Sequence, residues 1–205
     1  MICLLQANEP GVPIIYAPAF AAMNIKTGML SDGSMEYSLM SVAATEMARY
    51  YGLPAESSPG GTDSHVSDIQ NGYENGAMRL TSHLAWPDIS VGPGMLDGSM
   101  VSSLEQIMVD VEIFRLAKHA CRGIDTSSDK WLTDVIEEVG PGGNYLSEFS
   151  TAMSIRSGEW YHSGMGVHTS FEQWTAEGKQ DVLSNIREQI KQILDNYEPL
   201  PLDED

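Results

Sequence analysis

Short apolar runs alternate with longer helical patterns along this chain, and this alternation restricts its fold more than any other feature. Residues 12–17 read VPIIYA, a β-branched run that follows Pro10 and Gly11. Weaker runs of the same kind lie at 55–58 and 88–91. A short apolar stretch between turn residues is typical of a buried parallel strand. Three strand–loop–helix units in succession predict an α/β fold with a parallel sheet, either doubly wound or closed into a barrel.

A helical pattern follows each predicted strand. The first helix is expected from about residue 35 to residue 51, with Ser34 as its N-cap. The second is expected to begin at a cap formed by Asp63 or Ser64 and to extend to about residue 85. Further helices are predicted at 102–122, 129–139, 171–176 and 181–196, and residues 197–205 are predicted to form a polar tail.

The length of the chain limits what these strands can build. With 205 residues, the whole of 1–205 is predicted to be a single domain. Three strands are too few to close a barrel of eight. The first residues, ICLLQAN, resemble the end of a helix that has no strand before it. We therefore expect a chain whose first half is missing, and a complete small α/β domain is the alternative.

Charge and composition exclude several classes of function. The net charge is -18, with 29 acidic against 11 basic residues, which argues against a nucleic-acid surface and is compatible with a cationic ligand. Cys3 and Cys121 are far apart and are interpreted as small buried hydrophobes. No run of about eighteen apolar residues occurs, and no signal peptide is apparent, so neither membrane insertion nor secretion is expected. A cytoplasmic protein is therefore predicted.

Glycine-rich turns mark the first candidate ligand sites. Gly60 and Gly61 follow one predicted strand, and Gly92 and Gly94 follow the next. Neither turn matches a phosphate-binding pattern, so a tight turn that needs glycine for steric reasons is the other interpretation. The position is informative all the same, because ligands of parallel α/β folds bind beyond the carboxyl ends of the strands.

Asp63 and His65 directly follow the predicted strand at 55–58 and could act together as acid and base. Helix capping is the alternative role for Asp63. A metal site is not expected, because the five histidines lack the spacing of metal ligands and no H-E-x-x-H pattern occurs. These histidines are His65, His83, His119, His162 and His168.

Several ordered stretches resemble the trimethylamine methyltransferase family, which also includes glycine-betaine and other quaternary-amine methyltransferases. Residues 60–74 read GGTDSHVSDIQNGYE, similar to the family pattern G-x-T-D-S-K-x-P-D-x-Q-A-G-Y-E. Residues 96–106 read LDGSMVSSLEQ, similar to L-E-S-G-L-T-x-S-x-E-K. Residues 139–146, VGPGGNYL, resemble V-G-P-G-G-H-F-L, and the stretches at 170–174 and 198–203 resemble the usual end of the family's chains.

This resemblance extends from about residue 10 to the last residue and implies the C-terminal portion of a TIM (β/α)8 barrel. It also implies that a methyl group passes from a methylated amine to the cobalt of a corrinoid. The corrinoid would be carried by a partner protein, so no cofactor is expected to bind this chain directly. Co(I) would attack a carbon bonded to positively charged nitrogen, which leaves positioning and electrostatics as the enzyme's contribution. The alternative is a non-catalytic half-barrel that pairs with itself or with a separately encoded first half.

The resemblance also directs attention to individual residues. Asp63 and His65 are the expected catalytic pair. Glu56, which stands where the family commonly has a basic residue, is expected to face the barrel mouth and attract a quaternary ammonium group. Tyr16 would add a cation–π face there, with core packing as the alternative. These features predict a methylated amine without a carboxylate as substrate, in preference to glycine betaine.

Other positions complete the predicted site. Val91 stands where the family frequently has His, and Ser67 replaces a Pro of the family pattern. The remaining expected contacts are Ser58, Val91 and Gly92 for the substrate, and Gly60, Gly61 and Gly94 on the cofactor side.

Overall fold

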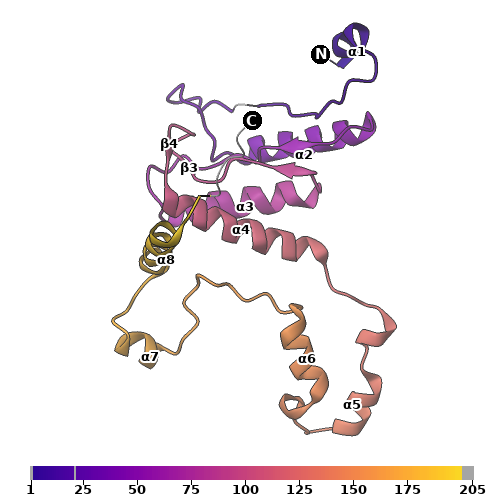
Figure 1. Cartoon of the computed structure of the whole chain (residues 1–205), viewed down its shortest axis with the longest axis vertical. Coiled ribbons are helices and arrows are strands. Elements are labelled where there is room, and N and C mark those ends of the chain that lie inside the picture. The colour runs from indigo at the N-terminus through magenta and orange to yellow at the C-terminus, as the bar shows by residue number, and fades with distance from the viewer. Residues whose placement is uncertain (1, 21, 200–205) are drawn as a thin grey trace.

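The computed structural model describes residues 2–20 and 22–199 and shows a small parallel sheet backed by helices (Figure 1). Tyr16 forms a parallel bridge with Ala55, and β1 (Glu56–Ser57) pairs in parallel with β2 (Ile89–Ser90). The three predicted strands are therefore neighbours in chain order, as successive β-loop-α units require. The hydrogen-bonded strand pairs are shorter than the predicted strands at 12–17, 55–58 and 88–91. The resulting mixture of helices and short strands is compatible with the predicted α/β class.

Three long helices follow the strands and lie side by side (Figure 1). They are α2 (Met35–Tyr50), α3 (Ile69–Leu84) and α4 (Leu104–Arg122). A fourth helix, α8 (Val182–Asn196), packs against α4. The sequence predicted all four to within a few residues, except for the start of α3. The buried apolar core of this layer includes Ala44, Ala48, Met78, Ala117 and Ile186.

Helix α3 begins at Ile69, so the prediction that Asp63 or Ser64 caps it was wrong. Asp68 is the N-cap, and its side chain accepts a hydrogen bond of 3.0 Å from the backbone N–H of Asn71. This hydrogen bond, together with one from Ser64, holds the pKa of Asp68 below its usual value. Ser64 therefore supports the cap by bonding to the carboxylate of Asp68, at 2.9 Å, instead of forming the cap itself.

Shorter elements complete the described chain. The remaining elements are α1 (Ile2–Asn8), β3 (Met95–Leu96), β4 (Val101–Ser102), η1 (Ser128–Lys130), α5 (Thr133–Val139), η2 (Tyr145–Ser147), α6 (Phe149–Ser157) and α7 (Phe171–Ala176). Figure 1 shows α5, α6 and α7 on an extended arm away from the layer of α2, α3 and α4. None of the residues in these three arm helices is buried. None of the helices in the described residues is long and apolar enough to cross a membrane.

The two faces of the sheet are distinguished by the side chain of Ser57. Its hydroxyl lies 2.7 Å from that of Ser82 on α3, so Ser57 faces the helices. Because side chains alternate along a strand, Glu56 and Ser58 lie on the opposite face. The pairing of Glu56 with Ile89 places Ile89 on that face as well.

We call this second surface the open face. By the same alternation and register, it carries Ile15, Ala17, Glu56, Ser58, Ile89 and Val91. Ile15 is 52% exposed and Ile89 is 39% exposed, although both are large apolar side chains. Apolar side chains on neighbouring strands form a surface that would be stabilised by a covering layer.

We expect the isolated chain to self-associate through the open face. Replacing both Ile15 and Ile89 by Lys should raise the monomer fraction at micromolar concentration, because charged side chains resist burial between two sheets. Sedimentation velocity measures this fraction. Ile69→Lys, at a position that is 88% exposed on α3, is the matched control and should leave the distribution unchanged. A wild-type chain that is a stable monomer would contradict the prediction.

Candidate functional site

Three loops meet beyond the carboxyl ends of the parallel strands, where a ligand site is expected in such folds. The first loop precedes α2, the second joins β1 to α3, and the third is the turn between β3 and β4. Together they enclose a cleft of about 360 Å³, which we call the mouth cleft. Its lining residues are Asn24, Thr27, Met29, Leu30, Asp63, His65, Asp97, Gly98 and Met100.

Asp63 lies in the mouth cleft and links two of its loops. One carboxylate oxygen accepts a hydrogen bond of 2.7 Å from the Ser31 hydroxyl, and the other accepts one of 3.1 Å from the backbone N–H of Gly33. The backbone N–H of Asp63 in turn donates to Glu74 on α3 at 3.0 Å. The predicted catalytic residue therefore has both carboxylate oxygens engaged in holding the first loop.

Asp32 and Ser99 extend this linkage to the third loop. The carbonyl oxygen of Asp32 accepts from the N–H of Gly61 at 3.1 Å, and its side chain accepts a hydrogen bond from the Ser99 hydroxyl. The carbonyl oxygen of Thr62 accepts from the N–H of Gly98 at 3.0 Å. Asp32 and Ser99 were not predicted from the sequence, because nothing in the local sequence of either loop indicates its partner in the other.

His65 and Asp97 form a side-chain pair at the edge of the mouth cleft. The Nδ1 atom of His65 lies 2.6 Å from a carboxylate oxygen of Asp97, and the His65 side chain is 80% exposed. A carboxylate only accepts hydrogen bonds, so Nδ1 carries the proton and the other ring nitrogen, Nε2, remains available to a ligand.

The glycines predicted to contact a cofactor are buried, and each approaches other parts of the chain closely. A Cβ atom on Gly60 would lie 2.7 Å from the carbonyl oxygen of Asp32, and one on Gly94 would lie 2.4 Å from Cγ1 of Ile107. Both glycines also have a positive φ, which L side chains rarely adopt. Gly61 is buried beneath Asp32 as well. None of the three presents an exposed surface for a cofactor.

The predicted substrate contacts divide between the two faces of the sheet. Glu56, Ser58 and Val91 share the open face, and Gly92 continues from Val91 beyond the end of β2. Tyr16 does not join them. It pairs with Ala55, which is buried on the helix side, so the ring of Tyr16 and the carboxylate of Glu56 leave the sheet in opposite directions.

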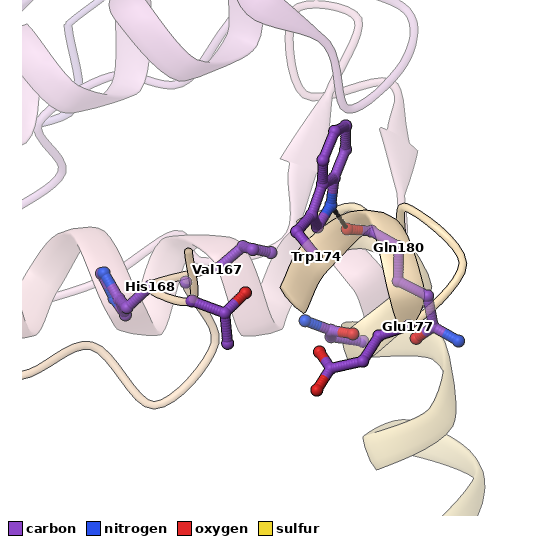
Figure 2. A pocket seen from close by; sticks show the side chains of 8 residues that line it. Val167, His168, Trp174, Glu177 and Gln180 are labelled. Atoms are coloured by element: carbon purple, nitrogen blue, oxygen red, sulfur yellow. Dashed lines mark hydrogen bonds between the residues drawn. The ribbon is translucent and has the colours of Figure 1, made fainter. Parts of the chain in front are cut away.

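A second cleft, of about 340 Å³, lies on the arm and the start of α8 (Figure 2). Figure 2 shows Val167 and His168 on one side of it and Glu177 and Gln180 on the other. The indole N–H of Trp174 donates to the carbonyl oxygen of Gln180 at 2.7 Å, which stabilises the turn after α7. This cleft shares no lining residue with the mouth cleft, so we do not assign it to the predicted site.

The described part of the chain contains no group of three or more His, Cys, Asp or Glu side chains arranged to hold a metal ion.

We expect Asp63→Ala to destabilise the chain by about 2 kcal/mol, because two donors lose a charged acceptor in a half-buried place. Urea unfolding followed by circular dichroism measures this change. Asp129→Ala, an exposed position in η1, is the control and should shift the free energy of unfolding by less than about 0.5 kcal/mol. Equal effects of the two substitutions would show that Asp63 does not hold the loops together.

Comparison with known proteins identifies the family. A family model described as "Trimethylamine methyltransferase (MTTB)" matches residues 1–205. The glycine betaine methyltransferase of Desulfitobacterium hafniense is 33% identical over 203 residues, which cover 98% of this chain and 42% of that protein. A trimethylamine methyltransferase of Methanosarcina barkeri is 31% identical over 205 residues, covering all of this chain and 41% of that protein. This chain therefore spans about two fifths of the length of these curated relatives, and it belongs to the trimethylamine methyltransferase family.

Proposed function

We propose that this chain forms the substrate-binding part of a corrinoid-dependent amine methyltransferase, as the C-terminal portion of a (β/α) barrel. The family match along the whole chain is the observation that carries the proposal. The arrangement of the strand ends supports it, because the mouth cleft lies beyond the carboxyl ends of the strands, where (β/α) barrels bind their ligands. The substrate would be a methylated amine, and the methyl group would pass to a corrinoid on a partner protein.

Glu56 is the residue that we assign to recognition of the substrate's positive charge. It lies on the open face between Ala17 and Ile89, which the strand register brings to either side of it, while Ile15 lies diagonally from it on the same face. A quaternary ammonium group requires both features, because its methyl groups need apolar contacts while its charge needs an anion. The same carboxylate would repel a substrate that carries its own carboxylate. We therefore propose a choline-like or simple methylated amine as the substrate, in preference to glycine betaine.

The chemistry limits what Glu56 contributes to the rate. The corrinoid of the partner protein would supply the nucleophile that accepts the methyl group. As the carbon–nitrogen bond breaks, its electron pair returns to nitrogen and the positive charge of the amine disappears. A carboxylate therefore stabilises the bound substrate more than the transition state, so Glu56 would lower KM without raising kcat.

We assign to His65 the donation of a proton to the released amine. A released tertiary amine is basic and takes up a proton in water. Protonated His65 carries a donor at Nε2, and Asp97 fixes the ring through Nδ1 at the edge of the mouth cleft. We propose that His65 delivers this proton, with Asp97 as the residue that orients it.

A second candidate function is assembly alone, in which the chain completes a barrel without contributing to catalysis. The exposed apolar residues of the open face favour this candidate, together with the coverage of only two fifths of the relatives' length. The two candidates differ in what a substitution at Glu56 would change. A purely structural segment would tolerate its neutralisation without any effect on substrate binding.

Methyl transfer should require the remaining part of the barrel. We expect no transfer from choline, trimethylamine or glycine betaine when the chain is mixed with a reduced corrinoid protein alone. Transfer should appear when the complementary segment of the Desulfitobacterium relative is supplied as a separate polypeptide. The absorbance change of the corrinoid on methylation measures the reaction. Robust demethylation by the chain alone would refute the need for a second part, and no activity in the reconstituted protein would contradict the methyltransferase proposal.

In the reconstituted protein, Glu56→Gln should raise KM for choline about tenfold and should not lower kcat, because the lost charge interaction is stronger in the bound substrate than in the transition state. The preference for choline over glycine betaine should shrink at the same time. Steady-state kinetics with both substrates measures these changes. Glu46→Gln, an exposed position on α2, is the control and should have no effect. Tighter binding of glycine betaine than of choline by the wild type would contradict the assignment.

A further inference from the structure

The backbone on either side of Pro93 is held by two buried charged side chains from different helices. Arg79 on α3 donates from Nη2 to the carbonyl oxygen of Gly92 at 2.9 Å. Asp110 on α4 accepts from the backbone N–H of Gly94 at 2.6 Å. The two side chains also form an ion pair, with Nη2 and Oδ2 separated by 3.4 Å, and both residues are fully buried. The loop that follows β2 is thus hydrogen-bonded at both ends of the segment from Gly92 to Gly94.

Burying the charges of Arg79 and Asp110 has a large desolvation cost, so the pair adds little to the stability of the helix layer. Burial raises the pKa of Asp110 and lowers the pKa of Arg79, and their mutual attraction offsets each shift only in part. The guanidinium group also stacks over the ring of Phe114 at 4.6 Å, while its Nε and Nη1 atoms have no hydrogen-bond partner among the residues that the structure describes. Buried ion pairs contribute little net stability compared with well-packed apolar side chains. The feature that apolar side chains cannot reproduce is the pair of directed bonds to Gly92 and Gly94.

The network continues to the loop that carries His65. The side-chain N–H of Gln106 donates to Asp110 at 2.8 Å, and its side-chain oxygen accepts from the Ser67 hydroxyl at 2.7 Å. Ser67 lies two residues after His65, between β1 and α3. One chain of hydrogen bonds therefore joins the loop after β1 to the loop after β2 through the side chains of Gln106 and Asp110 on α4.

The anchored segment adjoins the proposed substrate site. Val91 is on the open face opposite Ser58 and diagonal to Glu56, and Gly92 follows it directly. Gly92 and Gly94 both have a positive φ, at 86° and 92°, so this short segment contains two residues with unusually free backbones. The residues that fix it must therefore come from outside the loop, and Arg79 and Asp110 supply those contacts.

We propose that Arg79 and Asp110 are positioning residues for substrate binding, which hold the segment from Val91 to Gly94 as one wall of the amine site. Gln106 and Ser67 fix this wall relative to the loop that carries His65. The proposal rests on the proposed function in so far as the wall contacts an amine. We call the contacts of Arg79 with Gly92 and of Asp110 with Gly94 the clamp. The clamp is a property of this chain and is measurable without catalysis.

The test replaces the pair by apolar side chains of similar size, as Arg79→Met with Asp110→Leu. The helical circular dichroism should be retained, while the unfolding midpoint should fall, because the buried N–H of Gly94 and the side-chain amide of Gln106 lose their acceptor. Hydrogen exchange of peptides covering residues 91–96 should accelerate about tenfold, while exchange in the centres of α3 and α4 stays unchanged. Binding of tetramethylammonium, measured by NMR titration, should weaken about fivefold through loss of the ordered wall.

Arg49→Met is the matched control. Arg49 also donates from Nη2 to a backbone carbonyl, that of Ala85, at 2.7 Å, but Ala85 lies before β2 instead of after it. This substitution should leave both the exchange of residues 91–96 and the affinity for tetramethylammonium unchanged. If the double variant does not fold, Ser67→Ala removes only the outermost bond of the network and should still accelerate exchange in residues 64–67.

The outcomes separate the clamp from the proposed function. Unchanged exchange in residues 91–96, or acceleration spread equally over α3 and α4, would overturn the clamp. Faster exchange in residues 91–96 with unchanged affinity for tetramethylammonium would overturn the positioning role. A wild-type chain that does not bind tetramethylammonium at all would contradict the proposed amine site, and the exchange data would still decide the clamp.

Discussion

The hydrogen bond between Ser57 and Ser82 determines which face of β1 meets the helices, and the character of the strand ends follows from it. With Ser57 turned towards α3, the small side chain of Ala55 also packs on the helix side, and Glu56 is left on the open face. A register shift of one residue would reverse this arrangement and place the Glu56 carboxylate in the buried layer. Arg79, the buried arginine of that layer, already pairs with Asp110 and would not compensate a second buried carboxylate.

Carboxylates at the strand ends are held mainly by neutral donors. Asp63 accepts from a hydroxyl and a backbone N–H, Glu74 accepts from a hydroxyl, a backbone N–H and a side-chain amide, and Asp32 accepts from a hydroxyl. Such bonds fix the loops without cancelling the negative charge. In a chain with a net charge of -18, the mouth cleft therefore keeps a field that favours cations, independently of any single side chain.

The sequence predicted the parts of this structure that depend on local pattern. The periodic apolar positions located α2, α4 and α8, and the order of the three strands followed from the repeated strand–loop–helix units. The cap of α3 was misplaced because Asp63, Ser64 and Asp68 are all suitable cap residues. The choice between them depends on Ser31 and Gly33, which lie about thirty residues earlier and occupy the carboxylate of Asp63.

The face of the sheet on which each strand side chain lies was harder to predict than the positions of the strands themselves. The run at 12–17 is apolar at nearly every position, so its pattern does not distinguish the two faces, and Tyr16 was expected beside Glu56. Only the bridge between Tyr16 and Ala55 shows that they separate. The pairing of His65 with Asp97 was missed for a related reason. Each belongs to a family-like motif, but the distance between the motifs in space is set by the β3–β4 turn, whose positive-φ residues Asp97 and Ser99 give no clear signal in sequence.

Helix α3 connects these observations, because it contacts both loops that bound the proposed site. Glu74, near its start, holds the loop after β1, and Arg79, one turn further on, holds the loop after β2. Ser82, in its last turn, fixes the face of β1. A rigid helix with three such contacts ties Glu56, His65 and Val91 to a common support. Displacement of α3 relative to the sheet would therefore move both walls of the site together, whereas loss of the Arg79 contact alone would release only the wall formed by residues 91–94.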